Sequence, residues 1–489
     1  MSPRAPKHQL TKSGLVKDLL RAYESPNVTF LDPDGTWPIL WERAKGLHVW
    51  DAEGKKYLDL TGAFGVAAAG HANPRVVRAG QRQMARLLHA MGDVHPHELK
   101  ARLAQELSRI TFERWSRLAP SPGRPAYTAK TIFCNSGFEA VEAALKTAML
   151  ATGKPGVVAF EGAYHGLGYG ALNVTHRDYF RSPFRNQLRE FGYFVPFPAA
   201  HTGEARRPEQ TTSPTLDQTE SQIRHLLRRE PIGAVLVEPV QVRGGINIPM
   251  PGFLPLLRRL CNDHGTLLIL DEIYTGFGRT GKWFACEHWG VLPDLVCLGK
   301  ALTGGFPLSA CVGRADLMDR AWPPSTGEAI HTSTFLGHPV GCAMALAQIS
   351  ELQQRRLPDR SARLGNILLS ALDSGISTML AAGHSSQSQR AGSATQSVTL
   401  QLWIRGLGLL AGVELRNPDG TPATDATLRS VKALLARGFI VLPEGEHANV
   451  ISFTPPLTIS AGQLRAAARA VCDVLSTLKL APPALPGQR

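Results

Sequence analysis

Short apolar runs alternate with longer helix-like segments through the middle of the chain, between about residues 76 and 340. Each run has the length of a short buried strand, and the segments between them space apolar residues at three and four positions. Strands that are apolar on both faces are typical of a parallel sheet covered by helices on both sides. The pattern therefore predicts an α/β fold with a mostly parallel sheet. The expected strands are Thr131–Cys134, Val157–Phe160, Ala234–Val237, Leu267–Leu270 and Leu295–Leu298.

The pattern differs at the two ends of the chain. The first 40 residues or so read as an arm that packs on another surface, and a β-hairpin with its turn at Glu53 and Gly54 follows. After about residue 341 we expect a helix, a strand region from Gly408 to Leu415 and a closing helix from Ala461 to Leu480, which together form a smaller α+β domain. The predicted division is an N-terminal arm and hairpin that packs with the small domain (1–75), a large domain (76–340) and a C-terminal small domain (341–489).

Three polar stretches have the composition of solvated surface insertions. They contain mainly Pro, Ser, Gln, Gly and charged residues, and they interrupt the regular alternation of strands and helices. The stretches are Ala119–Ala126, Ala199–Pro214 and Gly383–Gln396.

Composition narrows the classes of protein. With 43% hydrophobic and 19% charged residues, the 489-residue chain can bury a large core. No run approaches the roughly 20 apolar residues of a membrane span, and the polar start does not resemble a secretory signal. The seven cysteines show no paired spacing, so reduced thiols in a cytoplasmic protein are expected. The net charge of +13 is dispersed and accompanies no nucleic-acid-binding motif, so neither nucleic-acid nor membrane binding is predicted.

Two charged residues end successive predicted strands. Asp271 follows Leu267–Leu270, and Lys300 follows Leu295–Leu298 29 residues later. The carboxyl ends of parallel strands are where α/β sheets bind their ligands. An acid and an amine placed there together suit pyridoxal phosphate, because the amine can form a Schiff base while the acid keeps the pyridine nitrogen protonated. The alternative is that Lys300 caps a strand or pairs with an acid in the core.

A second turn has the features of a phosphate site. The strand ending at Cys134 leads through Asn135, Ser136 and Gly137 into an amphipathic helix. The N–H groups of Ser136, Gly137 and Phe138 would be free at the helix start, where they and the helix dipole attract anions. A serine and glycine before a helix are, however, also common as an ordinary helix cap.

Two further segments lie beside predicted strand ends. Tyr164 and His165 are flanked by glycines, so the backbone can approach a ligand and the tyrosine ring can stack on a planar cofactor. A packed aromatic in a glycine-rich loop is the alternative. Glu238 ends a buried strand, with Gln241 and Arg243 just beyond it. There Glu238 is either at a functional opening or in a structural salt bridge.

Taken together, these motifs resemble the class III (ω-amino acid type) aminotransferases of the fold-type I pyridoxal phosphate enzymes. The likeness runs from about residue 40 to residue 475. It implies a large domain with a mostly parallel seven-stranded sheet between helices, and a smaller α+β domain. The shared motifs are GHANP at Gly70, CNSGFEA at Cys134, AYHG at Ala163, VEPVQ at Val237, DEIYTGFGRTG at Asp271, LGKALTGG at Leu298, HTSTFLGHP at His331, GLGLLAGVEL at Gly406 and PPLTIS at Pro455.

The resemblance implies a role for each matched residue. Lys300 would be the Schiff-base lysine that moves a proton between the substrate Cα and the cofactor, and Asp271 the partner of the pyridine nitrogen. Thr334 would reach the phosphate bound in the neighbouring subunit, which implies an obligate homodimer with shared active sites. No metal site is expected. The cofactor residues are then Ser136, Gly137, Phe138, Tyr164, His165, Glu238, Gln241, Asp271, Lys300 and Thr334.

The chain departs from the family pattern where many members bind the substrate carboxylate. Ser452 stands where they carry an arginine, and Arg243 stands where they carry the glutamate that pairs with that arginine. We therefore predict that Arg243 receives a substrate carboxylate, since its planar guanidinium suits two-point recognition. The alternative is that Arg243 points to solvent and the donor is an amine without a carboxylate.

Other departures concern the pocket walls. Leu167 replaces an arginine, and Tyr274 occupies a position often held by Gln or Val. With Phe64 and Trp37 as further pocket residues, these changes favour a more apolar pocket.

The expected activity is transfer of an amino group from an amino acid or ω-amino acid, similar to 4-aminobutyrate or acetylornithine, to a 2-oxo acid. Two other functions remain open from sequence. One is a racemase or epimerase on the same fold, and the other is a non-catalytic relative that binds the cofactor as a regulator.

Overall fold

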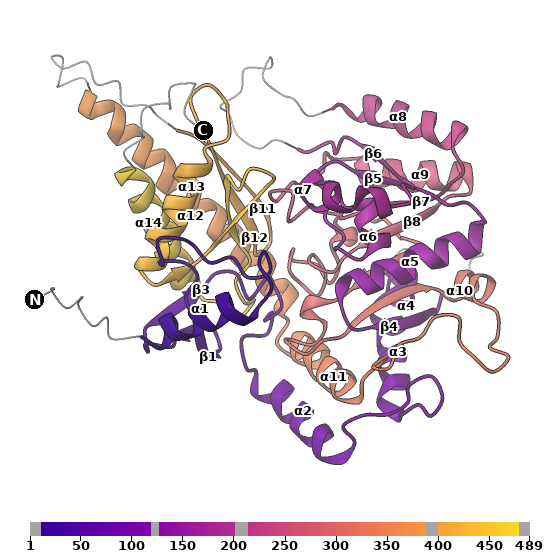
Figure 1. Ribbon diagram of the computed structural model, residues 1–489. Coiled ribbons are helices and arrows are strands. Elements are labelled where there is room, and N and C mark those ends of the chain that lie inside the picture. The colour runs from indigo at the N-terminus through magenta and orange to yellow at the C-terminus, as the bar shows by residue number, and fades with distance from the viewer. Residues whose placement is uncertain (1–10, 119–126, 201–213, 388–399, 479–489) are drawn as a thin grey trace, which may run out of the picture.

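A seven-stranded sheet forms the larger part of the molecule. The computed structural model describes residues 11–118, 127–200, 214–387 and 400–478, and Figure 1 shows the sheet with helices on both of its faces. The strand order is β4-β10-β9-β8-β7-β5-β6, and every pair is parallel except those that β10 makes with β4 and β9. The strands are β4 (Ala129–Cys134), β5 (Gly156–Phe160), β6 (Gly192–Val195), β7 (Ile232–Val237), β8 (Leu267–Asp271), β9 (Leu295–Leu298) and β10 (Ser309–Arg314).

The prediction of a mostly parallel α/β sheet is confirmed, and all five expected strands are present. Sequence reasoning missed β6 and β10. The residues of β6 are mostly half-buried at the sheet edge, so they lack a continuous apolar run. The strand β10 contains serine, alanine, cysteine and glycine, whose small side chains give a weak strand signal.

Alternate residues of each strand enter two hydrophobic clusters, one on each face of the sheet. Val158 and Phe160 belong to the cluster that includes residues of α3 and α9, whereas Val157 and Ala159 belong to the cluster under α5. This alternation is the two-residue period of a strand. The helices of this part are α2 (Pro74–Arg86), α3 (Glu98–Ile110), α4 (Phe112–Leu118), α5 (Gly137–Thr152), α6 (Tyr169–Val174), α7 (Asp178–Arg181), α8 (Leu216–Arg229), α9 (Phe253–His264), α10 (Ala315–Ala321) and α11 (Pro339–Gln354).

The C-terminal part is an antiparallel sheet of order β11-β12-β15-β14 packed with helices. The strand expected over Gly408–Leu415 is instead the second half of a hairpin whose turn holds Gly408 at φ 60°. The closing helix is confirmed as far as Thr477. The elements are β11 (Gln401–Leu407), β12 (Leu410–Arg416), β14 (Leu442–Glu444), β15 (Val450–Phe453), α12 (Leu357–Gln387), α13 (Thr424–Ala436) and α14 (Ala461–Thr477).

The predicted N-terminal hairpin joins a sheet with a C-terminal strand. Its strands β2 (His48–Asp51) and β3 (Lys56–Asp59) pair antiparallel, and β3 also pairs in parallel with β13 (Phe439–Ile440). The strand β1 (Trp41–Lys45) completes this sheet. The arm helix α1 (Lys12–Tyr23) has no buried residue. The domain boundaries at residues 75 and 340 stay predictions.

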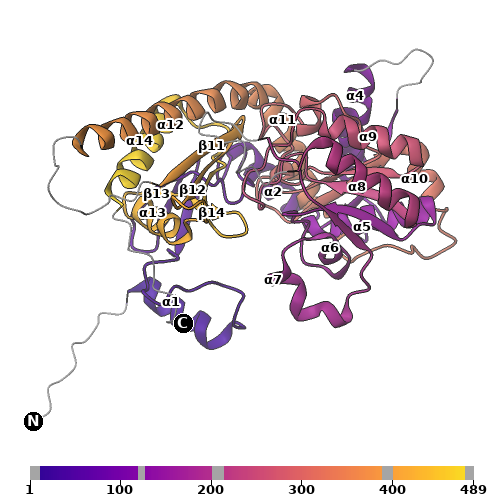
Figure 2. The same ribbon diagram turned by 90° about the horizontal axis from the view of Figure 1, so that it is seen from above.

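The long helix α12 differs from its prediction at its C-terminal end. It continues to Gln387, so the expected insertion beginning at Gly383 is wrong for its first five residues. The rest of that stretch, all of 119–126 and residues 201–213 lie outside the described residues. The segment Leu357–Ala381 is long and apolar enough to cross a membrane, by length and composition alone. Figure 2 shows α12 alongside the C-terminal sheet, and the following residues of one of its faces lie in the main core: Leu364, Leu368, Leu372 and Ile376.

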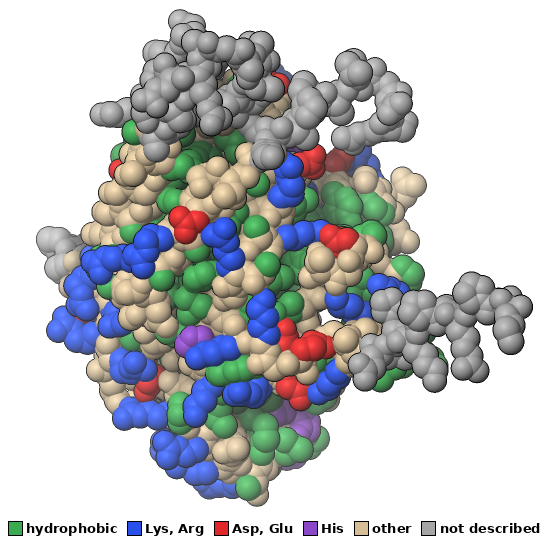
Figure 3. Space-filling model, turned by 90° about the vertical axis from the view of Figure 1, so that its left-hand side faces the viewer, with side chains coloured by type: hydrophobic (Ala, Val, Ile, Leu, Met, Phe, Trp, Pro, Cys, Tyr) green, Lys and Arg blue, Asp and Glu red, His purple; other side chains and the backbone are tan. Residues whose placement is uncertain are grey.

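The excess of basic residues is spread over the surface. On the face that Figure 3 shows, Lys and Arg side chains lie among hydrophobic and acidic ones in many separate places. Several are paired, such as Lys12 with Glu42 and Lys432 with Asp32 and Asp34. The charge therefore forms no single basic patch on this face.

Candidate active site

A cavity of about 420 Å³ opens beyond the carboxyl ends of β7, β8 and β9. This is the edge of the sheet where the parallel strands deliver the residues that follow them. Eight of the predicted site residues line the cavity, together with Ile273 and Tyr274. The eight are Gly137, Phe138, Tyr164, His165, Glu238, Arg243, Asp271 and Lys300.

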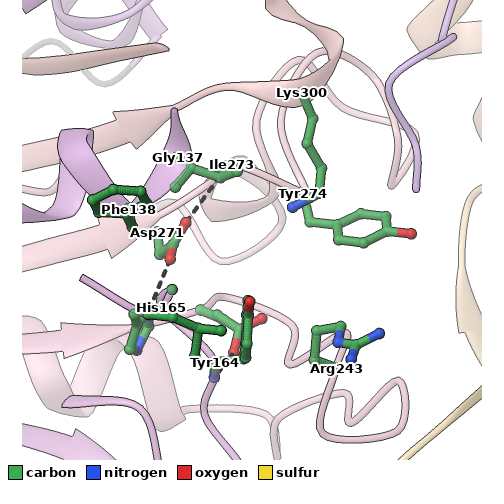
Figure 4. Close-up of a pocket in the computed structure, with 12 residues that line it drawn as sticks. Gly137, Phe138, Tyr164, His165, Arg243, Asp271, Ile273, Tyr274 and Lys300 are labelled. Carbon is green, nitrogen blue, oxygen red and sulfur yellow. Dashed lines mark hydrogen bonds and ion pairs between the residues drawn. The ribbon is translucent and has the colours of Figure 1, made fainter. Parts of the chain in front are cut away.

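Asp271 is the last residue of β8, and its carboxylate is fixed by two donors (Figure 4). Oδ2 lies 2.7 Å from His165 Nδ1, and Oδ1 accepts a hydrogen bond of 3.1 Å from the backbone N–H of Ile273. Because an ionised carboxylate only accepts, His165 carries its proton on Nδ1. The side chain of His165 is fully buried, so the histidine holds the acid in one orientation at the cavity wall.

Lys300 follows β9 after a single glycine and adopts a positive φ of 38°. In Figure 4 its amine points into the cavity, and Nζ lies 4.5 Å from the ring centroid of Tyr274. Within the described residues Lys300 makes no ion pair, which excludes the structural pairing considered from sequence. Burial lowers the pKa of the Lys300 amine, against the opposing effect of the charges of Asp271 and Glu238. A lowered pKa increases the fraction of neutral amine, which is the nucleophilic form.

Glu238 follows β7 directly and binds backbone rather than a cation. Its carboxylate accepts hydrogen bonds from the N–H groups of Tyr164 (3.1 Å) and Val242 (3.2 Å). No salt bridge involves Glu238 in the described parts of the chain, so the structural ion pair considered from sequence is wrong. Burial raises the pKa of Glu238 to about 7. The carboxyl group thus ties the Tyr164 loop to the loop after β7.

The start of α5 leaves an unpaired hydroxyl beside the cavity. Ser136 is the N-cap residue, but its side chain makes no capping hydrogen bond. Its Oγ is buried and has no hydrogen-bond partner among the described residues. Ser136 therefore stands at the N-cap position without the side-chain hydrogen bond of an ordinary cap. A free hydroxyl with the N–H groups of a 16-residue helix suits a phosphate group.

Besides Ser136, five residues predicted for the site do not line this cavity. Gln241 instead links two loops, because its amide N–H donates to Glu161 O (2.7 Å) and its Oε1 accepts from Asn247 (3.0 Å). Ser452 is buried on β15 and donates to Leu442 O at 3.0 Å. The other three are Trp37, which is half-buried against Phe30, and Phe64 and Thr334, which are exposed. The predicted roles of all five stay predictions.

Arg243 has a partner that sequence reasoning missed. Its Nη1 lies 3.2 Å from Oε2 of Glu444 on β14, and its Cζ lies 5.5 Å from the ring centroid of Tyr164. The alternative in which Arg243 points freely to solvent is therefore wrong. No local pattern identifies Glu444, because it lies 201 residues away in a three-residue strand.

Comparison with known proteins decides the family. The model of the family "Aminotransferase class-III" matches residues 31–475. The chain belongs to the class III aminotransferases. It is 35% identical over 441 residues, 90% of this chain and 92% of the relative, to the acetylornithine aminotransferase of Methanosarcina mazei. It is 34% identical to the 5-aminovalerate aminotransferase DavT of Pseudomonas aeruginosa over 87% of this chain and 91% of the relative.

Solved structures agree with this family. The ornithine aminotransferase of Toxoplasma gondii superposes with a TM-score of 0.76 at 26% identity, over 96% of this chain and 95% of that chain. The (S)-enantioselective ω-transaminase of Thermomicrobium roseum gives 0.75 at 28% identity, over 95% and 97%. The predicted family, fold class and transaminase activity are thereby confirmed.

The residues at the cavity fit the cofactor of this family. Class III aminotransferases use pyridoxal phosphate. The unpaired Ser136 hydroxyl at a helix start, the amine of Lys300 and the oriented carboxylate of Asp271 supply the three kinds of group that this cofactor requires. No cluster of three or more potential metal ligands occurs in the described ranges.

Proposed function

We propose that this aminotransferase binds pyridoxal phosphate in the cavity and moves an amino group from an amino acid or ω-amino acid to a 2-oxo acid. The supporting observation is that the amine of Lys300 and the carboxylate of Asp271 face one cavity from neighbouring strands. When bound, the cofactor supplies a carbonyl carbon that reacts with amines and a ring that takes up electrons from the substrate's Cα–H bond.

The proposed binding mode assigns one group of the chain to each end of the cofactor. Ser136 and the N–H groups of Gly137 and Phe138 hold the phosphate at the start of α5. Asp271, oriented by His165, would accept a hydrogen bond from the protonated ring nitrogen and so keep the proton there. The ring of Tyr164, which lines the cavity, would stack on the cofactor ring. Gln241 and Glu238 would not contact the cofactor directly. Their hydrogen bonds to Glu161 and Tyr164 hold the loop that carries Tyr164 in place.

Lys300 has two tasks in this proposal. Its neutral amine would hold the cofactor covalently, and the lowered pKa of this amine would favour that bond. With the substrate bound, Nζ would move a proton between the substrate Cα and the cofactor. The ring of Tyr274 attracts the ammonium form of Lys300 that results.

The proposed donor carries a carboxylate that Arg243 receives. Arg243 lines the cavity opposite Lys300 in Figure 4. The names of the relatives support ω-amino donors, since they include acetylornithine, 5-aminovalerate, putrescine and 4-aminobutyrate aminotransferases. A donor similar to 4-aminobutyrate or acetylornithine places its amine at the cofactor and its carboxylate at Arg243.

We also propose a cytoplasmic homodimer with shared active sites. Thr334 is exposed and away from the cavity of its own chain, which is compatible with a role at the neighbouring subunit's phosphate. Large apolar side chains are exposed in the same part of the chain and in the segment after α2, as an interface requires. They include Leu88, Met91, Val94, Ile330 and Phe335. Six of the seven cysteines are buried and all are free, which suits a reducing compartment.

The test compares Lys300→Ala with Lys282→Ala, a change of an exposed lysine on the loop after β8. We expect the wild type and Lys282→Ala to show the visible absorbance of the lysine-bound cofactor and to aminate pyruvate or 2-oxoglutarate. Lys300→Ala should lose both. Retention of transamination by Lys300→Ala would contradict the assignment. Conversion of one amino-acid enantiomer into the other without any 2-oxo acid, and without amino transfer, would favour the racemase alternative.

A further inference from the structure

Arg177 is a second arginine next to Arg243, which lines the cavity. It directly precedes the short helix α7, and its side chain is half-buried. Its Nη2 donates a hydrogen bond of 2.7 Å to the backbone carbonyl of Arg243. Arg177 makes no ion pair with any residue that the structure describes. A partly desolvated guanidinium without a carboxylate partner favours binding of an anion.

The charges around Arg177 do not balance. Arg243 pairs with the buried carboxylate of Glu444, whose side chain is 2% exposed, and the charge of Arg177 acts on the same carboxylate without pairing with it. The nearby carboxylate of Glu446 is exposed, so water screens its effect. Burial lowers the pKa of Arg177, and the charge of Arg243 lowers it further. The two arginines and Glu444 therefore carry a net charge of +1, which one added carboxylate would neutralise.

The same arrangement explains how Arg243 could leave Glu444. Removing a cation from a buried carboxylate is costly unless another positive charge remains nearby. Arg177 lowers the pKa of Glu444 through its charge, as Arg243 does. It also fixes the backbone of Arg243 through the hydrogen bond to its carbonyl. The guanidinium of Arg243 can thus turn while its main chain stays in place.

We propose that Arg177, Arg243 and Glu444 form a carboxylate-recognition cluster in which Arg243 moves from Glu444 to the substrate carboxylate while Arg177 remains to balance Glu444. Arg177 is then a positioning residue, and Arg243 makes the contact. This inference rests on the proposed aminotransferase function and narrows its substrates to those with one carboxylate remote from the reacting amine. An amine without a carboxylate leaves Arg243 paired with Glu444 and gains nothing from the cluster.

The experiment compares 4-aminobutyrate with n-butylamine, two donors of equal carbon number that differ in the carboxylate. Both are assayed with the wild type, Arg177→Met, Arg177→Lys and the control Arg185→Met. Arg185 lies in the segment after α7 and pairs with Asp178 at the surface, so its loss removes one charge without touching the cluster. The visible absorbance of the bound cofactor is recorded for each protein.

We expect Arg177→Met to raise KM for 4-aminobutyrate by about tenfold, because without Arg177 the carboxylate of Glu444 holds Arg243 more strongly and the charge-assisted contact of Arg243 with the substrate is weakened. For n-butylamine, kcat/KM should stay within about twofold of the wild type. Arg177→Lys should recover most of the loss because it keeps the charge. Arg185→Met should match the wild type with both donors.

Two results would contradict the proposed carboxylate-recognition cluster without contradicting the proposed aminotransferase function. One is equal behaviour of Arg177→Met and Arg185→Met with 4-aminobutyrate. The other is an equal loss with both donors in Arg177→Met, which is the result of a general structural defect. A wild type that shows cofactor absorbance but aminates no 2-oxo acid from either donor would instead contradict the proposed function itself.

Discussion

Replacing Arg243 with methionine separates the stability of the Arg243–Glu444 pair from its role in binding. Glu444 is 2% exposed and Arg243 31% exposed, with 3.2 Å between Nη1 and Oε2. Removing one partner of a buried pair typically costs about 3–5 kcal/mol. Arg243 is partly solvated and the charge of Arg177 still lowers the pKa of Glu444, so we expect the low end of this range, about 3 kcal/mol of unfolding free energy.

The loss of unfolding free energy in Arg243→Met should depend on pH in a defined direction. Burial already raises the pKa of Glu444, and Arg243 is the largest influence that lowers it. In Arg243→Met the folded-state pKa of Glu444 rises further above its unfolded value, so the folded protein binds the extra proton. Stability of the variant then falls as pH rises from the unfolded pKa, about 4.3, through the folded one. The deficit relative to wild type should therefore be larger at pH 8 than at pH 5.

Urea unfolding at both pH values measures this effect, with Glu444→Gln and the double variant Arg243→Met/Glu444→Gln completing a double-mutant cycle. The double variant should be more stable than Arg243→Met alone, because no charge is then left buried without its partner. Two results would contradict this reasoning: Arg243→Met is as stable as the double variant at pH 8, or it loses no stability between pH 5 and pH 8. In either case Arg243 does not stabilise the buried charge of Glu444.

Three further changes test the site. Ser136→Ala should weaken cofactor affinity about tenfold, the effect of one hydrogen bond to a charged group, as measured by fluorescence titration of the apoprotein; unchanged affinity would mean that the hydroxyl does not hold phosphate. Asp271→Asn should lower kcat by about 100- to 1,000-fold through the loss of one oriented charge while Lys300 still retains the cofactor; a loss of less than about threefold would remove Asp271 from the catalytic pair. Glu444→Gln should lower KM for 4-aminobutyrate roughly fivefold, because about 1 kcal/mol of ion-pair attraction between Arg243 and Glu444 is removed. A raised KM would contradict the proposed movement of Arg243 to the substrate.

The central sheet and the placement of Lys300 and Asp271 at one cavity could be predicted because their signals are local in the sequence. A strand such as Leu267–Asp271 is a continuous apolar run ending on an acid, and Lys300 ends the next run in the same way. Parallel strands then place both residues at one edge of the sheet. The edge strand β6 and the small-residue strand β10 lack such runs, so their pairing depends on tertiary packing.

The substrate end of the cavity could not be predicted to the same extent, because its contacts cross the chain. The family resemblance marked Arg243 as a departure, but its ion-pair partner comes from β14 and its backbone contact from Arg177. Neither partner stands in a motif. The interaction of Lys300 with the ring of Tyr274 likewise depends on how two loops meet after the sheet ends.

The most direct test of the account is chemical mapping of the cofactor's attachment site. The holoenzyme is reduced with borohydride, digested and analysed by peptide mass spectrometry, so that the lysine carrying the cofactor is identified. We predict a single pyridoxyl group on Lys300, and none in a parallel sample of Lys300→Ala. A pyridoxyl group on another lysine of the wild type, or no attachment at all, would contradict the assignment of the cavity beside Asp271 as the active site.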